Sequence, residues 1–291
     1  MSTSRLHIDL VFFSFFFSVV FCLFCCLVDN IMGLWVFMEL MGMAIVPSFF
    51  YSNNSSISSF YNALLSYVVI SGISSVLIMS GILFSGLYYL LLLGFVVKLG
   101  FFPFSFWLYA VFGGSNWAFI FFLSVVSKFP VLFFCFLLQN TVEGVLYWDC
   151  FFTLVCCSMF FWLLSNSWEF VWCHISLSSV TTLVVACFCS EPLASFYIFF
   201  YYSIWATVTI AYFYFISSWQ GNKYSFWVYC FLLLVTPLSL PIFYKLGVCL
   251  ALLYSSVSVL LSWCLYSFSE QMYLYKVGSD CFYSSVSNSW L

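Results

Sequence analysis

Four charged residues, Glu39, Lys98, Lys128 and Lys245, stand inside apolar stretches long enough to cross a bilayer. A charge at the centre of a membrane helix costs about 2.5–3.5 kcal/mol on insertion scales, so such residues are rare and mark ion pathways, proton relays or charge pairs. A lysine there can take up and release protons near neutral pH, because burial and a nearby carboxylate act on its proton affinity in opposite directions.

The spacing places these charges deep in their spans. Lys98 follows a run of about ten apolar residues, and Lys128 lies midway between Asn116 and Gln139, as expected near the centre of a span of about 20 residues. We predict that Glu39 and Lys98 pair, since each charge is less costly with a partner. A buried lysine can also be a structural pair with a neighbouring subunit, but four such residues together favour proton transfer.

His174 is a fifth candidate, because it lies inside a span and is followed by serines and threonines between positions 176 and 182. An imidazole among hydroxyl groups can relay protons. The same surroundings also suit a hydrogen-bonded core histidine, and the sequence does not decide between the two.

The composition requires a membrane protein. Of 291 residues, 66% are hydrophobic and only 5% are charged, which is too few charges to cover a surface in water. We therefore predict an all-α fold, a single transmembrane domain over 1–291. The net charge of −3 comes with no basic cluster, so no nucleic-acid partner is indicated.

Ten apolar segments separated by short polar breaks predict a helix bundle of about ten spans. They run over 8–28, 33–51, 60–84, 87–110, 116–138, 148–165, 169–190, 193–216, 226–247 and 250–269. Pro237 and Pro241 each remove an amide donor, which predicts a broken helix just before Lys245. We expect the Lys245 ammonium to lie in a hydrated pocket beside the break. There it would donate hydrogen bonds to the backbone carbonyls that the break leaves without amide partners.

Other kinds of site are not indicated. The chain has 14 cysteines, but Cys22 and Cys25, at a metal-like spacing, lie inside an apolar span and are interpreted as small apolar fillers. There is no metal-ligand cluster, no phosphate-binding glycine loop and no candidate site for haem or flavin. We therefore expect the chain to bind no metal or cofactor of its own.

The residue usage also carries information about the gene. Phe (41), Tyr (20), Cys (14) and Trp (12) are unusually common, and the codons for Phe, Tyr and Cys are T-rich. A T-rich coding strand is typical of animal organelle genomes, so we expect a multi-pass protein of the mitochondrial inner membrane.

Several segments share a pattern with one family. The run from Lys98 to Trp107 resembles the K-L-G-x-x-P-F-H-x-W signature of subunit 2 of mitochondrial NADH:ubiquinone oxidoreductase, respiratory complex I. The stretch from Trp35 to Pro47 is similar to that family's W-V-G-x-E-x-N-x-x-x-x-x-P, with Glu39 on its glutamate. Ser127 to Pro130 resembles its Q-K-x-x-P, Ser178 to Val180 its Y-S-S-I, and Pro237 to Lys245 its broken helix.

This resemblance implies an antiporter-like proton channel in the membrane arm of complex I. Glu39 and Lys98 would form a modulating pair, Lys128 the central relay and Lys245 the exit or storage site. NADH, FMN, iron–sulfur clusters and ubiquinone would belong to other subunits. The implied partners are the antiporter-like subunit 4, subunit 4L, accessory subunits and phospholipids such as cardiolipin. The alternatives are a stand-alone cation/proton antiporter and a purely structural subunit of the membrane arm.

Overall fold

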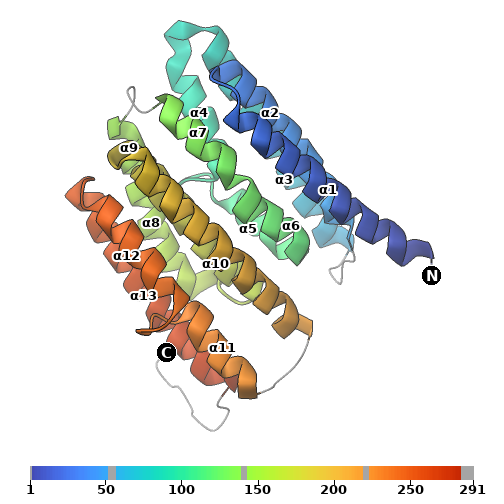
Figure 1. The fold of residues 1–291 in the computed structure, drawn as a ribbon, viewed down its shortest axis with the longest axis vertical. Coiled ribbons are helices and arrows are strands. Elements are labelled where there is room, and N and C mark those ends of the chain that lie inside the picture. Colours follow the sequence, from blue (N-terminus) through green and yellow to red (C-terminus); the bar gives the residue numbers. More distant parts are fainter. Residues whose placement is uncertain (1, 52–56, 139–142, 219–222, 283–291) are drawn as a thin grey trace. The chain divides into compact units, whose positions relative to one another are not determined.

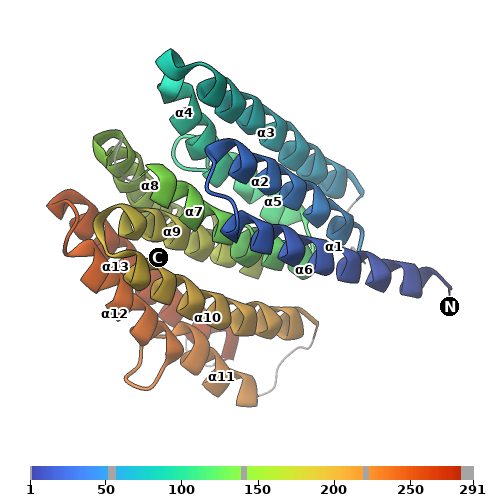
Figure 2. The same cartoon turned by 45° about the horizontal axis from the view of Figure 1, so that its top comes forward.

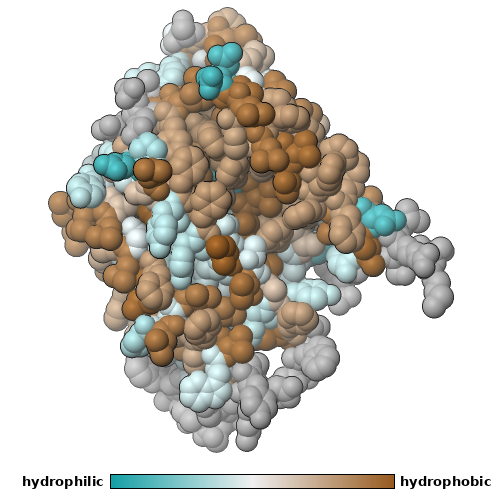
Figure 3. All heavy atoms as spheres, in the orientation of Figure 1, coloured by the Kyte–Doolittle hydropathy of each residue, from teal (hydrophilic) through white to brown (hydrophobic). Residues whose placement is uncertain are grey.

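The computed structural model describes residues 2–51, 57–138, 143–218 and 223–282, and every regular element within these ranges is helical. The expected all-α fold is therefore confirmed. Seven helical stretches within these ranges are long and apolar enough to span a membrane, and apolar residues cover much of the face that Figure 3 shows.

Most of the predicted spans correspond to one continuous helical stretch. These are α1 (Ser2–Cys26), α2 (Ile31–Ile45) with its 3₁₀ extension η1 (Val46–Phe50), α3 (Ile57–Leu83), α8 (Glu143–Leu164), α9 (Trp168–Cys189), α10 (Pro192–Ser218) and α13 (Val257–Phe282). The span predicted over 250–269 is displaced: α13 begins later and continues past Glu270. The predicted span ended at residue 269, whereas the helix continues to Phe282.

Three stretches are irregular. The short 3₁₀ turn η2 (Ser85–Leu87) leads into α4 (Tyr88–Leu99), which is separated from α5 (Phe106–Gly114) by six residues. Between α6 (Trp117–Phe121) and α7 (Lys128–Leu138) lies a π-helical turn, η3 (Phe122–Val126). A second six-residue break separates α11 (Lys223–Leu233) from α12 (Leu240–Leu252). The break at the two prolines was predicted, whereas the predicted span 87–110 is interrupted where a continuous helix was expected.

The chain divides into two compact units. The first comprises residues 1–143 with 175–180, and the second comprises 144–174 with 181–291. The prediction of a single transmembrane domain remains a prediction.

Within the first unit, α1 runs beside α2, and α3 packs against both α4 and α5 (Figures 1 and 2). Gly94 and Gly114 permit this close packing. A Cβ atom at Gly94 would lie 2.9 Å from the Ser74 carbonyl oxygen, and one at Gly114 would lie 2.6 Å from that of Ser59. Small residues at helix contacts let backbones approach closely inside membranes.

Gly100 ends α4 and turns the chain into the first break. Its φ of 71° is left-handed, a region that glycine adopts without the steric cost of a Cβ atom. The Phe101 amide donates to the Val96 carbonyl over 3.1 Å, which closes the helix end in the manner of a Schellman cap. The indole of Trp107 donates to the Val97 carbonyl over 3.2 Å. These bonds fix the last turn of α4, which carries Lys98.

We predict that Gly100→Ala destabilises the protein by about 1–3 kcal/mol, from backbone strain and overpacking together. The new Cβ would lie 2.4 Å from Leu108 Cδ1, whereas one at Gly144 would meet nothing within 4 Å. The thermal melting temperature of the protein extracted in mild detergent measures the effect, with Gly144→Ala as the control. Equal melting temperatures for the two variants would contradict the role given to Gly100.

Candidate functional site

The Glu39 carboxylate and the Lys98 ammonium meet between the middle of α2 and the last turn of α4. Lys98 Nζ donates to Glu39 Oε1 in a direct ion pair, so the predicted pairing is confirmed. Lys98 also benefits from its position, because a cation is favoured at the C-terminal end of a helix. About one fifth of each side chain is exposed, 19% for Glu39 and 21% for Lys98, so the pair is not sealed inside the protein.

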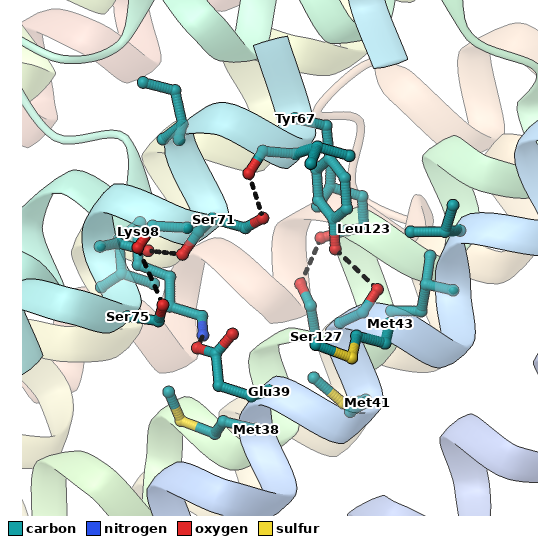
Figure 4. Close-up of a pocket in the computed structure, with 18 of the residues that line it drawn as sticks. Met38, Glu39, Met41, Met43, Tyr67, Ser71, Ser75, Lys98, Leu123 and Ser127 are labelled. Carbon is teal, nitrogen blue, oxygen red and sulfur yellow. Dashed lines mark hydrogen bonds and ion pairs between the residues drawn. The ribbon is translucent and has the colours of Figure 1, made fainter. Parts of the chain in front are cut away.

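The exposed part of this pair faces a cavity of about 300 Å³ (Figure 4). The hydroxyl-bearing residues Tyr67, Ser71 and Ser75 of α3 line it together with apolar side chains from α2, α3 and α4. The Tyr67 hydroxyl donates to the Gly42 carbonyl over 3.1 Å and so links α3 to α2 beside the ion pair. The pair therefore has both polar neighbours and room for water.

Lys128 follows directly after the π-helical turn and is almost fully buried, with 3% of its surface exposed. The Ser127 amide donates to the Phe122 carbonyl over 3.0 Å, which is the five-residue spacing of a π-helix. π-Helical turns are frequent at functional sites. Lys128 Nζ donates to the Ser176 carbonyl over 3.0 Å and to the Ser179 hydroxyl over 2.6 Å. The central turn of α9 thus supplies the oxygen atoms that hold this ammonium.

A second, smaller cavity of about 40 Å³ is lined by both Lys98 and Lys128. Its wall includes Ser124, Ser127 and Ser176 among mostly apolar side chains. Its volume exceeds the about 10–15 Å³ that one ordered water requires. Lys98 and Lys128 therefore both line one small space that can hold water.

Lys245 of α12 pairs with Glu270 of α13, with 3.0 Å between Nζ and Oε2. This pair is more deeply buried than Glu39–Lys98, since only 14% of the Lys245 side chain and 5% of the Glu270 side chain are exposed. The sequence interpretation did not select Glu270. Its signal was present, because a lone carboxylate follows a lone lysine by 25 residues across two apolar helices.

The expected role of Lys245 at the helix break needs correction. Its ammonium donates to Glu270 and not to a carbonyl of the break. Neutral side chains make the hydrogen bonds to the break instead. The Trp205 indole donates to the Leu232 carbonyl over 2.8 Å, and the Gln271 side chain donates to the Leu233 carbonyl and accepts from the Val235 amide. The physical reason is that a carboxylate is a stronger partner for an ammonium than a neutral carbonyl. Lys245 lies within α12, five positions beyond its first residue.

His174 is completely buried in the second unit. Its ring packs against Phe161 with 4.7 Å between ring centres, and its carbonyl accepts a bond of 3.4 Å from the Tyr266 hydroxyl. The side chain of His174 therefore lies in an aromatic neighbourhood. Along α9 it stands two residues before Ser176, the residue whose carbonyl contacts Lys128.

The three lysines share one structural feature, which is that each lies near an irregular segment of its helix. Lys98 precedes the break at Gly100, Lys128 follows the π-helical turn, and Lys245 follows the proline break. Irregular backbone at membrane depth is tolerated where it is buried in protein or lines a water-filled cavity. The arrangement is chemically suited to passing protons between side chains and trapped water. Among the described residues, no group of three potential metal ligands forms a metal site.

Comparison with known proteins supports the fold. No protein-family model matches the sequence, and no curated protein is similar to it. The structure is similar to a chain of respiratory complex I from Thermus thermophilus, from a structure with bound aureothin, with a TM-score of 0.77 at 14% identity. The match covers 92% of this chain and 69% of that one. The protein therefore shares the fold of that complex I chain.

Proposed function

We propose that this chain is a proton-translocating core membrane subunit of respiratory complex I, of the subunit 2 type. One observation carries the proposal: Lys98, paired with Glu39, and Lys128, held by α9, line the same small cavity. The fold similarity to a complex I chain supports it, as do the sequence motifs around Lys98 and Lys128.

In this proposal, the coupling between the groups is electrostatic. While Glu39 holds a negative charge next to Lys98, the lysine keeps its proton; when the carboxylate moves away or is neutralised, the Lys98 proton is free to leave. Water in the shared cavity carries it toward Lys128, which takes it up once it has passed on its own proton and become a neutral amine. The resulting ammonium donates hydrogen bonds to the oxygens of Ser176 and Ser179. Lys245 and Glu270 form a second charge pair that stores or releases a proton.

The chain acts in this proposal as part of an NADH:ubiquinone reductase that translocates protons. NADH, FMN, the iron–sulfur clusters and ubiquinone are assigned to other subunits, so electron transfer drives this chain from a distance. The proposed neighbours are the antiporter-like subunit 4, subunit 4L, accessory subunits and phospholipids such as cardiolipin. The T-rich coding pattern supports a location in the mitochondrial inner membrane.

Lys98→Ala tests the proposal. We expect proton translocation per NADH oxidised to fall by about tenfold. A positioned proton donor usually contributes about 10²–10⁴-fold. The expected loss is smaller here because water in the larger cavity replaces part of the function of the lost ammonium. The measurement compares dye-reported proton uptake with NADH oxidation in proteoliposomes containing the intact complex. Normal stoichiometry in this variant would instead assign the chain a structural role.

Native gel electrophoresis tests the other alternative. The proposal requires this chain to migrate with NADH dehydrogenase activity in one large assembly. A chain that migrates alone and exchanges cations for protons in vesicles would be a stand-alone antiporter.

A further inference from the structure

The break between α11 and α12 leaves particular backbone groups without helical partners. In a continuous helix the Leu233 carbonyl would accept a bond from the amide of residue 237, but Pro237 has no amide hydrogen. The Val235 amide would donate to the carbonyl of residue 231, but the helix ends at Leu233 and this amide turns away. Both groups need partners from elsewhere, because unpaired backbone groups inside a membrane are costly.

Gln271 of α13 supplies both partners. Its side-chain oxygen accepts a bond of 2.9 Å from the Val235 amide, and its side-chain nitrogen donates to the Leu233 carbonyl over 3.4 Å. The side-chain amide of glutamine carries the same donor and acceptor groups as a peptide unit. It therefore stands in for the peptide groups that the break removes.

The same amide also reaches the buried ion pair. Gln271 Nε2 donates to Glu270 Oε1 over 3.4 Å, while the other oxygen of that carboxylate, Oε2, accepts from Lys245. A glutamine side chain has two N–H donors and one oxygen acceptor. Leu233 and Glu270 use the two donors, and Val235 uses the acceptor.

We propose that Gln271 is a positioning residue that ties the charge state of the Lys245–Glu270 pair to the helix break. The inference rests on the proposed function for its use in proton transfer, while its structural content concerns the second unit alone. When a proton passes from Lys245 Nζ to Glu270 Oε2, an ammonium and a carboxylate become a neutral amine and a neutral carboxylic acid. The charge-assisted bond from Gln271 to Glu270 is then weakened, since bonds to charged acceptors are the stronger ones.

The weakened bond frees the Gln271 amide to shift, and its bonds to the break shift with it. A proton movement at Glu270 is therefore transmitted to the ends of α11 and α12. Other bonds hold the break in shape without Gln271. The Trp205 indole donates to the Leu232 carbonyl, and the Tyr201 hydroxyl donates to the Leu240 carbonyl, each over 2.8 Å. Variants of Gln271 are for this reason expected to fold.

Hydrogen–deuterium exchange in the intact complex, read by mass spectrometry over residues 233–240, tests the proposal. Gln271→Met keeps the side-chain length and removes its hydrogen bonds, so amide exchange in this segment should rise about tenfold, as expected for the loss of one ordinary hydrogen bond. Ser267→Ala is the control, because this exposed hydroxyl bonds the Cys264 carbonyl of its own helix. Unchanged exchange in Gln271→Met would overturn the proposal.

A double-mutant cycle tests the coupling itself. Glu270→Gln mimics the neutral acid and should raise exchange in 233–240 when Gln271 is present, and should add little in the Gln271→Met background. Equal effects in both backgrounds would show that Glu270 acts on the break without Gln271 and would overturn the proposal.

Proton translocation is measured separately in the same preparations. If the coupling in exchange is found while Lys245→Ala translocates protons normally, the role of Gln271 holds and the proposed function of the lysine fails. The two failures are thus distinguishable.

Discussion

Complexes that carry Lys128→Met are expected to assemble normally and to lose proton translocation by about 10²-fold, the contribution typical of a positioned proton donor or acceptor. Methionine preserves most of the lysine stem volume and removes the titrating group. Lys128 is 3% exposed, so bulk water cannot replace the lost group as it does at the more exposed Lys98. If electron transfer is tightly coupled to translocation, NADH oxidation falls in parallel.

The measurement is the ratio of proton uptake to complex content, with complex content read from native gels. Lys276→Met is the matched control, because Lys276 lies near the end of α13 and does not line the cavity that Lys98 and Lys128 share. A fall in complex content as large as the fall in translocation would make Lys128 a structural residue.

The sequence predicted the parts of the site that depend on local chemistry. The Glu39–Lys98 pair followed from the cost of two isolated charges at membrane depth, and the break before Lys245 followed from two prolines that lack amide hydrogens. The candidate spans also corresponded to helices, because long apolar runs between polar breaks leave few alternatives. These predictions needed no knowledge of which helices are neighbours.

Most of the missed features depend on tertiary packing. The Gly100 break is the exception, because Lys98 and Gly100 followed by Pro103 form a local signal for a helix end. The π-helical turn before Lys128 has no such local signal. The predicted span ended at residue 269, so Glu270 was left outside it and was not selected as a site residue. Its burial, with 4% of its surface exposed, becomes visible only once α13 packs beside Lys245. The assignment of Lys245 to the break carbonyls failed for the same reason, since a better partner came from a helix that the sequence had ended too early.

The two ion pairs differ in burial, and this difference has an energetic consequence. About one fifth of the Glu39 and Lys98 side chains is exposed, whereas only 5% of the Glu270 side chain is exposed. Removing one partner of a buried pair typically costs about 3–5 kcal/mol, because an uncompensated charge stays behind. Exposed pairs are screened by water and contribute about 0–1 kcal/mol. The cost of breaking Glu39–Lys98 should lie between these limits and below that of Lys245–Glu270.

Glu270→Leu is therefore expected to destabilise the protein by about 3–5 kcal/mol, and Glu39→Leu by clearly less. The double variant Lys245→Met with Glu270→Leu should recover most of the lost stability, since replacing both charges by apolar groups is often neutral or favourable. Thermal melting of the complex in detergent measures all three.

Recovery in the double variant would show that the pair is not needed for the fold. A double variant as unstable as Glu270→Leu would instead show that the Glu270 side chain stabilises α13 through packing or through Gln271. If the double variant is stable but no longer translocates protons, the buried charges are present for their chemistry, because an apolar pair would hold α12 and α13 together equally well.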